Sequence, residues 1–235
     1  MGNITTIGII GLGNAGAPIL NNLNKSNKYK LVAFDIDTKK LNDIPKNIIK
    51  ATSIKNLAEQ CNVVLTCLPK PEHVLEVVDG KDGLLQNAST GMVWIDTSTT
   101  NFKQTQKLAT KASTYGVSML EATLTGGVHA LQNNNMVCLA GGDEVTFKLW
   151  KEVLQDAIGE VVVLCGEVGA GAIAKVVSNM LAFTNMVAAS ECMMIAKKAG
   201  LDLENFFDAI RVSAGNSFAW ETVVPHIFNQ KYESG

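Results

Sequence analysis

Near its start the chain reads Ile7-Gly8-Ile9-Ile10-Gly11-Leu12-Gly13-Asn14-Ala15-Gly16, a short apolar run that leads directly into closely spaced glycines. This pattern predicts a strand, a tight turn and the start of a helix. Gly11 permits the turn, Gly13 lets the backbone approach a pyrophosphate, and Gly16 lets the helix pack closely on the strand. The N–H groups at the start of that helix then suit phosphate groups. A purely structural glycine turn is the alternative.

Asp35 follows at the end of the next apolar run, Lys30-Leu31-Val32-Ala33-Phe34. An acidic residue about 20 residues after the glycines accepts hydrogen bonds from a ribose 2′-OH and repels a 2′-phosphate. Residues 35–40 contain no arginine, although Lys39 and Lys40 lie there. We therefore predict a dinucleotide site that prefers NAD, with NADP less favoured.

Composition limits the classes of protein that the chain fits. Its 235 residues are 47% hydrophobic and 18% charged with a formal net charge of −2, which is ordinary for a globular enzyme and gives no reason to expect nucleic acid or an anionic membrane as partner. The N-terminus lacks the basic region of a signal peptide, so we expect a cytoplasmic protein. The five cysteines and three histidines are scattered without metal-ligand spacing, so we assign no metal.

Strand-like and helix-like segments alternate up to about Gly166. Apolar runs rich in β-branched residues predict strands at 63–68, 92–95, 118–120, 136–140 and 161–164. Amphipathic spacing predicts helices at 15–25, 53–60, 71–78, 101–114 and 143–156. This alternation indicates a doubly wound, mostly parallel sheet of the Rossmann type, with ligands bound at the carboxyl ends of its strands, where Gly11, Leu68-Pro69 and Asp96 to Thr99 fall.

After Gly166 the pattern becomes helical. Residues 169–199 form one long apolar pattern, and 203–212 form another helix. Lys175 and Glu191 leave only about 15 uncharged residues between them, fewer than the roughly 20 that a bilayer requires. We therefore expect a buried helix packed on other helices or on a second subunit, hence a homo-oligomer. The predicted domains are 1–165, binding the dinucleotide, and 166–235, all-helical.

Two polar patterns suggest chemistry. Lys175 is the only charged residue between Glu167 and Glu191, and Asn179 lies one helical turn later. Burial and a helix N-terminus both lower a lysine pKa, which suits proton transfer, whereas a lysine that extends from the helix edge to water is the alternative. Glu121 to Gly127 follows a predicted strand and ends in Thr125-Gly126-Gly127, a turn that suits a carboxylate, with a flexible surface turn as the alternative.

Together these segments resemble the β-hydroxyacid dehydrogenase family. The resemblance rests on residues 11–16, Leu68-Pro69, residues 95–99, residues 125–127, residues 141–143 and residues 169–179, in the family's order. It implies that the following residues bind the nicotinamide cofactor: Gly11, Leu12, Gly13, Asn14, Ala15, Gly16, Asp35, Leu68, Pro69 and Thr99. It also implies that Thr125, Gly126 and Gly127 bind the substrate carboxylate, that Lys175 is the catalytic lysine, and that Asn179 orients the substrate.

The chain departs from the family pattern at several positions. Glu121, Thr123 and Thr125 stand where relatives have aspartate, proline and serine, and Ala130 and Asn134 stand where glycines are usual. Relatives also continue beyond the position of Gly235, so the helical domain is expected to be partial. Two functions remain open: a dehydrogenase or reductase acting on a small β-hydroxyacid or its semialdehyde, and a nucleotide-binding module without turnover.

Overall fold

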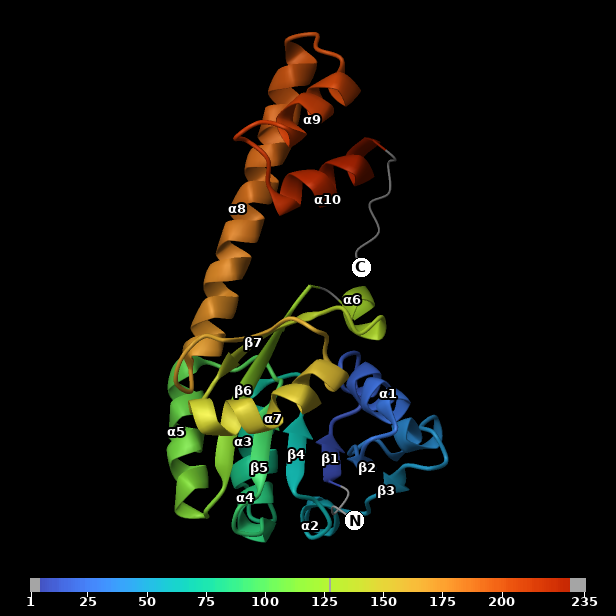
Figure 1. Ribbon diagram of the computed structural model, residues 1–235, viewed down its shortest axis with the longest axis vertical. Helices are drawn as coiled ribbons and strands as arrows, with labels where there is room; N and C mark the ends of the chain where they lie inside the picture. Colours follow the sequence, from blue (N-terminus) through green and yellow to red (C-terminus); the bar gives the residue numbers. More distant parts are fainter. Residues whose placement is uncertain (1–4, 127, 229–235) are drawn as a thin grey trace. The chain divides into compact units, whose positions relative to one another are not determined.

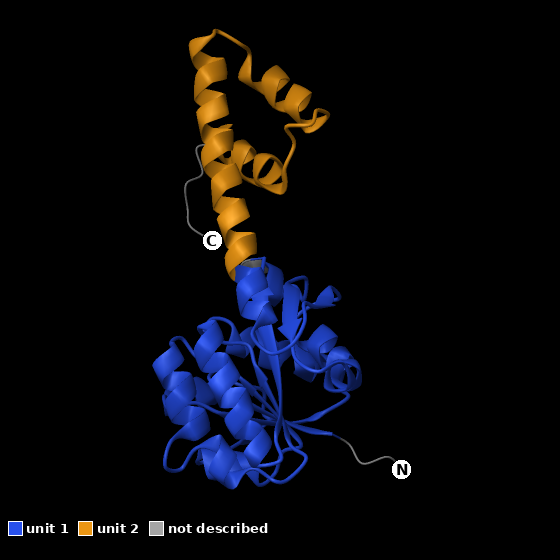
Figure 2. Cartoon of the chain, turned by 90° about the vertical axis from the view of Figure 1, so that its left-hand side faces the viewer, with its two compact units in different colours: residues 1–175 blue, residues 176–235 orange. Residues whose placement is uncertain are grey.

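The computed structural model describes residues 5–126 and 128–228 and divides the chain into two compact units, 1–175 and 176–235 (Figure 2). The division falls inside a long helix, later in the chain than the predicted boundary near Gly166.

The first unit is built on one eight-stranded sheet (Figure 1). Its strands are β1 (Thr6–Ile10), β2 (Lys30–Phe34), β3 (Ile49–Lys50), β4 (Val63–Thr66), β5 (Val93–Asp96), β6 (Ser118–Thr125), β7 (Val137–Gly141) and β8 (Val162–Leu164). They lie in the order β3-β2-β1-β4-β5-β6-β7-β8. Every neighbouring pair is parallel except β6 and β7, which are antiparallel, so the predicted Rossmann-type, mostly parallel sheet is confirmed.

Helices cover both faces of this sheet. They are α1 (Gly16–Ser26), the 3-10 helix η1 (Thr38–Asn42), α2 (Ile54–Ala58), α3 (Pro71–Asp79), α4 (Leu84–Asn87), α5 (Phe102–Thr114), α6 (Val128–Gln132) and α7 (Glu144–Ala157). One core joins Ile7 and Ile9 to α1 and α7, and the other joins Ile10 to α2, α3 and α5. This division follows from the period of two along each strand, which sends neighbouring side chains to opposite faces.

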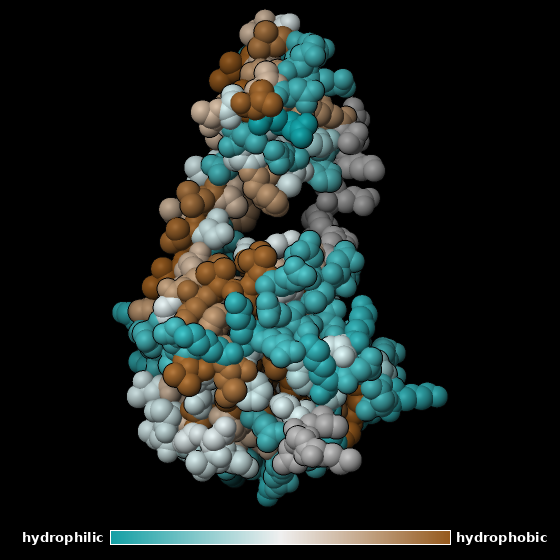
Figure 3. Space-filling model, in the orientation of Figure 1, coloured by the Kyte–Doolittle hydropathy of each residue, from teal (hydrophilic) through white to brown (hydrophobic). Residues whose placement is uncertain are grey.

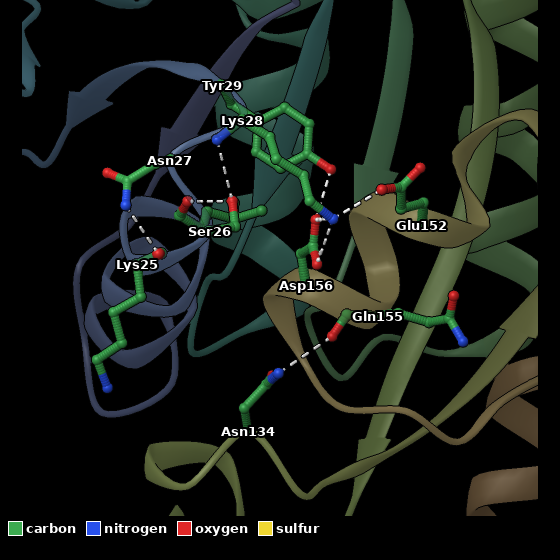
Figure 4. A network of polar contacts seen from close by, with 10 residues as sticks. Lys25, Ser26, Asn27, Lys28, Tyr29, Asn134, Glu152, Gln155 and Asp156 are labelled. Carbon is green, nitrogen blue, oxygen red and sulfur yellow. Dashed lines mark hydrogen bonds and ion pairs between the residues drawn. The ribbon is translucent and has the colours of Figure 1, made fainter.

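A polar network fastens α7 to the turn between α1 and β2 (Figure 4). The Lys28 ammonium lies 2.7 Å from Oε1 of Glu152 and 2.9 Å from Oδ2 of Asp156, and the Tyr29 hydroxyl donates to the same Asp156 oxygen at 2.7 Å. The Lys28 side chain is about half-exposed, so water screens both ion pairs and they contribute little stability by themselves. The burial of Tyr29 and its bond to Asp156 raise the pKa of its hydroxyl, so the hydroxyl stays a donor.

The remaining helices are α8 (Ala170–Lys198), α9 (Leu203–Arg211) and α10 (Phe218–Phe228). In the second unit, Trp220 packs against Phe206 edge to face and against Phe207 in a stacked arrangement, with ring centroids 5.8 and 5.9 Å apart. By length and composition alone α8 is apolar enough to cross a membrane, a property that core helices of soluble proteins share. The predicted helical C-terminal region is confirmed in the described residues.

Candidate active site

The glycine turn lies where β1 ends and α1 begins. Gly11 has φ +95°, and a Cβ atom on it would lie 2.3 Å from the carbonyl oxygen of Cys67. A Cβ on Gly16 would lie 1.9 Å from the carbonyl oxygen of Gly11, whereas no atom lies within 4 Å of a Cβ on Gly13. Packing of the turn itself therefore requires Gly11 and Gly16. Gly13 instead leaves open space against the backbone, which fits the close approach of a diphosphate.

Asp35 holds this turn in place from the neighbouring strand. Its Oδ2 atom accepts the Leu12 backbone N–H at 2.6 Å and lies 3.2 Å from the Lys40 ammonium, while Oδ1 accepts the Asp37 N–H at 2.8 Å. The carboxylate is only 5% exposed. Since each carboxylate oxygen can accept two hydrogen bonds, Oδ1 retains capacity for a further donor such as a ribose hydroxyl.

The loops after β4 and β5 meet beside the turn. Ser98 accepts the Leu68 backbone N–H at 2.9 Å, and the Leu68 side chain is 3.0 Å from the Cβ position of Gly11. Pro69 and Thr99 follow these residues and are exposed. The structure thus brings the glycine turn, Leu68-Pro69 and Ser98-Thr99 to one edge of the sheet.

The buried carboxylate of Asp96 binds the start of the loop that follows β5. Asp96 ends β5, and its Oδ1 accepts the Thr66 hydroxyl at 2.8 Å and the Ser98 backbone N–H at 3.1 Å. Trp94 Nε1 donates to the Thr66 oxygen at 2.8 Å. Burial raises the pKa of Asp96 to about 6, against the lowering effect of these hydrogen bonds.

A hollow of about 880 Å³ starts at the glycine turn and follows α1. Its wall includes Gly13, the exposed Asn14 and the half-exposed Lys40, together with the outer face of α1. Leu68, Pro69 and Thr99 are not part of that wall, so the hollow reaches only part of the predicted cofactor site.

The segment predicted as a turn at Glu121 to Gly127 differs in the structure. Residues 121–125 continue β6, because they pair with β7 from Glu121–Gly141 to Thr125–Val137. The sequence predicts a strand only at 118–120, and backbone pairing with β7 extends this strand to Thr125. Gly126, with φ +133°, is exposed, and Gly127 lies outside the described residues.

One face of β6 meets the beginning of α8. Glu121, Thr123 and Thr125 share a strand face because they are two residues apart. Glu121 accepts hydrogen bonds from backbone N–H groups at the start of α8, and the Thr123 hydroxyl lies 3.1 Å from the Gly171 carbonyl oxygen. Thr125 therefore belongs to the strand face on which α8 begins.

Lys175 lies on α8, one turn after Gly171. It is half-buried, and burial lowers the pKa of its ammonium below the ordinary value. Among the residues that the structure describes, it forms no ion pair. Asn179 is the next residue on the same helix face by spacing and is half-buried, but it belongs to the second unit.

Two supporting residues were not identified from the sequence. Ser98 is an ordinary loop residue in the sequence, and its role depends on the backbone of Leu68, thirty positions away. Glu121 was assigned to a turn, and only the fold brings it to residues 169–172. In the described part of the chain, no group of three or more His, Cys, Asp or Glu side chains is placed to hold a metal ion.

Two family models match consecutive parts of the chain. Residues 6–166 match the family model described as the NAD binding domain of 6-phosphogluconate dehydrogenase. Residues 169–235 match the model described as NAD-binding of NADP-dependent 3-hydroxyisobutyrate dehydrogenase.

Similar individual proteins carry related names. The mitochondrial 3-hydroxyisobutyrate dehydrogenase of Mus musculus is 32% identical over 230 residues, which cover 96% of this chain and 67% of that protein. A solved 3-hydroxyisobutyrate dehydrogenase of Mycobacterium tuberculosis with L-serine has a TM-score of 0.87 at 30% identity, covering 94% of this chain and 75% of that one. Psf3, solved with NADP+ and 2-OPP, shares the fold with a TM-score of 0.80 at 22% identity, covering 95% of this chain and 79% of that one. The chain thus spans about two thirds of the length of the curated relatives it matches.

Proposed function

Because this chain belongs to the β-hydroxyacid dehydrogenase family, we propose that it is a nicotinamide-dependent oxidoreductase that interconverts a small β-hydroxyacid and its semialdehyde. One observation carries the proposal beyond family membership. The half-buried Lys175 lies on the helix whose first turn is bonded to β6, the strand that ends in Thr125. A candidate proton-transfer group and a candidate carboxylate-binding residue are therefore attached to the same strand.

Lys175 acts as general acid and base in this proposal. A lysine in water holds its proton too tightly to serve as a base at neutral pH, and the burial that lowers the pKa of Lys175 reduces that obstacle. As the free amine, Lys175 takes the proton of the substrate hydroxyl while hydride leaves the carbon that bears this hydroxyl. In the reductive direction its ammonium returns the proton to the carbonyl oxygen.

Substrate binding is assigned to two places on the chain. Thr125 offers a hydroxyl, and Gly126 and Gly127 offer backbone N–H groups, which together suit the substrate carboxylate. Asn179, one turn beyond Lys175, carries an amide that can donate to the substrate oxygen and orient it. Thr125 carries one methyl group more than the serine of relatives, so the substrate pocket is expected to differ in shape rather than in chemistry.

The glycine turn and Asp35 are assigned to the cofactor, with NAD preferred. When bound, the nicotinamide ring accepts or supplies the hydride. The residues of this chain position it: the open face of Gly13 and the neighbouring N–H groups suit the diphosphate, and Asp35 suits a ribose hydroxyl. Leu68, Pro69 and Thr99, at the same sheet edge, are assigned to the part of the cofactor nearer the reacting ring.

A panel of small hydroxyacids, followed at the nicotinamide absorbance with NAD or NADP, tests the proposal. We expect turnover of at least one β-hydroxyacid with NAD, and faster turnover than with α-hydroxyacids of equal length. Cofactor binding without turnover of any member would contradict the proposal and favour a nucleotide-binding module.

We also propose that the protein is a homo-oligomer in which a second copy covers α8. Apolar side chains gather along this helix in Figure 3. Val176, Met180, Phe183 and Val187 are each about 60% exposed or more in the single chain (67%, 62%, 61% and 59%). Exposed apolar patches of this kind are typical of interfaces between protein chains.

A further inference from the structure

The carboxylate of Glu121 lies in an enclosed place on β6. The residue is only 1% exposed. Its Oε2 accepts the backbone N–H groups of Gly169 at 3.0 Å and Gly171 at 3.1 Å, and its Oε1 accepts that of Ala172 at 2.9 Å. Three N–H donors from residues 169–172 therefore converge on one buried side chain that lies about fifty residues earlier in the chain.

The surroundings leave room for this carboxylate and for little else. A Cβ atom on Gly141, at the end of β7, would lie 2.6 Å from Oε2 of Glu121. A Cβ on Gly171 would lie 3.0 Å from the same oxygen and 2.6 Å from the carbonyl oxygen of Leu139. Two glycines from different elements thus form the walls of the space, so the carboxylate is held tightly between β6, β7 and α8.

The contact of the Glu121 carboxylate with the N–H groups of Gly169, Gly171 and Ala172, called the joint below, places a negative charge at a helix N-terminus. The first N–H groups of a helix lack intrahelical partners and carry a partial positive charge, so a carboxylate is the favoured acceptor there. Burial raises the pKa of Glu121, and the three N–H bonds oppose that rise by stabilising the charged form. The Thr123 hydroxyl, two residues along β6, adds a second bond to the carbonyl oxygen of Gly171.

The joint lies one helical turn before Lys175. Residues four apart in a helix share a face, so Lys175 lies on the same side of α8 as Gly171, whose backbone N–H Glu121 accepts. Any shift of the first helical turn against β6 would displace Lys175 relative to Thr125, which is on that strand. Displacement of a catalytic group by about 1 Å can lower turnover about a hundredfold.

We propose that Glu121 is a positioning residue for the reaction, because its carboxylate fastens the first turn of α8 to β6 and so sets the place of Lys175 against Thr125. This inference rests on the function proposed for Lys175. Glu121 contacts neither the glycine turn nor Asp35, which follow β1 and β2, so Glu121 is expected to affect turnover without affecting cofactor binding.

The test compares the wild type with Glu121→Gln. Glutamine keeps the shape but replaces one accepting oxygen with an NH2 group that faces an N–H donor. We expect kcat to fall about 10- to 100-fold while KM for the cofactor stays within about twofold. Amide hydrogen exchange provides a readout that does not depend on activity: backbone amides of residues 169–175 should exchange faster in Glu121→Gln.

Asp143→Asn is the matched control. Asp143 caps α7 by accepting the Thr146 N–H at 2.9 Å, but it is exposed, and α7 carries no proposed site residue. The same acid-to-amide change at this cap should leave kcat and exchange at 169–175 at wild-type values. Should Glu121→Gln fail to fold, Gly171→Ala perturbs the same joint from the helix side and should lower kcat in the same way.

Lys175→Ala, measured in parallel, separates the two proposals. Loss of turnover in Lys175→Ala together with wild-type kcat or wild-type exchange in Glu121→Gln would overturn the positioning role alone. Wild-type turnover by Lys175→Ala would overturn the proposed function and the positioning of Lys175 with it. Faster exchange at 169–175 combined with a selective fall in kcat supports the inference.

Discussion

The backbone N–H of Leu12 donates to Oδ2 of Asp35 across 2.6 Å, which joins the glycine turn after β1 to the end of β2. The Asp35 carboxylate therefore has a backbone partner within the chain itself. Oδ2 of Asp35 also forms an ion pair with the half-exposed ammonium of Lys40 at 3.2 Å. The residue that is expected to bind a ribose hydroxyl therefore already has a positively charged neighbour. This position of Asp35 is the basis on which we propose NAD as the preferred cofactor, because a 2′-phosphate would have to lie against the Asp35 carboxylate.

Cofactor preference follows from this pair. We predict that NAD binds at least about tenfold more tightly than NADP, a difference of about 1.4 kcal/mol. Asp35→Asn should narrow the difference, because it removes the negative charge while Lys40 stays positive. Fluorescence titration of both cofactors against both proteins measures this. Equal or tighter binding of NADP by the wild type would contradict the assignment.

The glycines of the turn should respond differently to alanine. Gly16→Ala places a Cβ 1.9 Å from the Gly11 carbonyl oxygen, so it should lower the free energy of unfolding by more than about 1 kcal/mol. Gly13→Ala meets no atom within 4 Å, so it should leave unfolding nearly unchanged but weaken NAD binding. Urea denaturation and NAD titration of the two variants provide the comparison. Unchanged NAD affinity in a folded Gly13→Ala would place the diphosphate elsewhere.

Asp96 gives a prediction about pH. Burial raises its pKa to about 6 in the folded protein, above the value of an exposed aspartate. The folded state therefore takes up this proton first as the pH falls, and the burial penalty present above pH 6 is relieved between about pH 6 and 4. Relative to Asp96→Asn, the wild type should gain stability over that interval, by at most about 1.4 kcal/mol for each pKa unit.

Urea denaturation of both proteins at several pH values measures this difference. Using the difference removes the contribution of other carboxylates, such as Asp143, whose pKa is lowered by its bonds to Thr146. A difference that stays constant from pH 7 to 4 would show that Asp96 keeps an ordinary pKa.

The assembly prediction concerns the exposed apolar side of α8. Light scattering of the wild type should give a mass of at least two chains, and Val187→Lys should shift the mass toward one chain, because a charge at an apolar interface is costly. Val145→Lys is the matched control: Val145 is 78% exposed but lies on α7, so the same substitution should leave the mass unchanged. A monodisperse wild-type monomer would rule the proposal out.

Local patterns sufficed for the regular parts of the fold. The run Ile7 to Gly16 predicted β1, the turn and α1 because strand period, glycine spacing and helix start are all local signals. The two-residue β3 and the helix α10, which contains Pro225, were not predicted. Both depend on tertiary packing: β3 is a short edge strand paired with β2, and α10 is held by the contacts of Trp220.

The residues of the candidate site also divide into those that a local sequence pattern identifies and those that only the fold brings together. Its glycines and Lys175 could be singled out because each breaks a local pattern. The role of Glu121 could not, because its partners at 169–172 and the glycines that surround it come together only through the pairing of β6 with β7. The sequence places Glu121 in a turn after the strand, whereas in the structure it lies within β6 and accepts hydrogen bonds from the start of α8.

Turnover by Lys175→Ala and Lys175→Arg tests the central claim most directly. If Lys175 is the general acid and base, Lys175→Ala should lower kcat about 10²- to 10⁴-fold with nearly unchanged NAD affinity, because proton transfer is lost while the glycine turn is intact. Lys175→Arg should not restore activity, since a guanidinium stays protonated. If both variants turn over a β-hydroxyacid at near wild-type rates, Lys175 is a lysine extending from the edge of α8 to water, and the proposed mechanism is wrong.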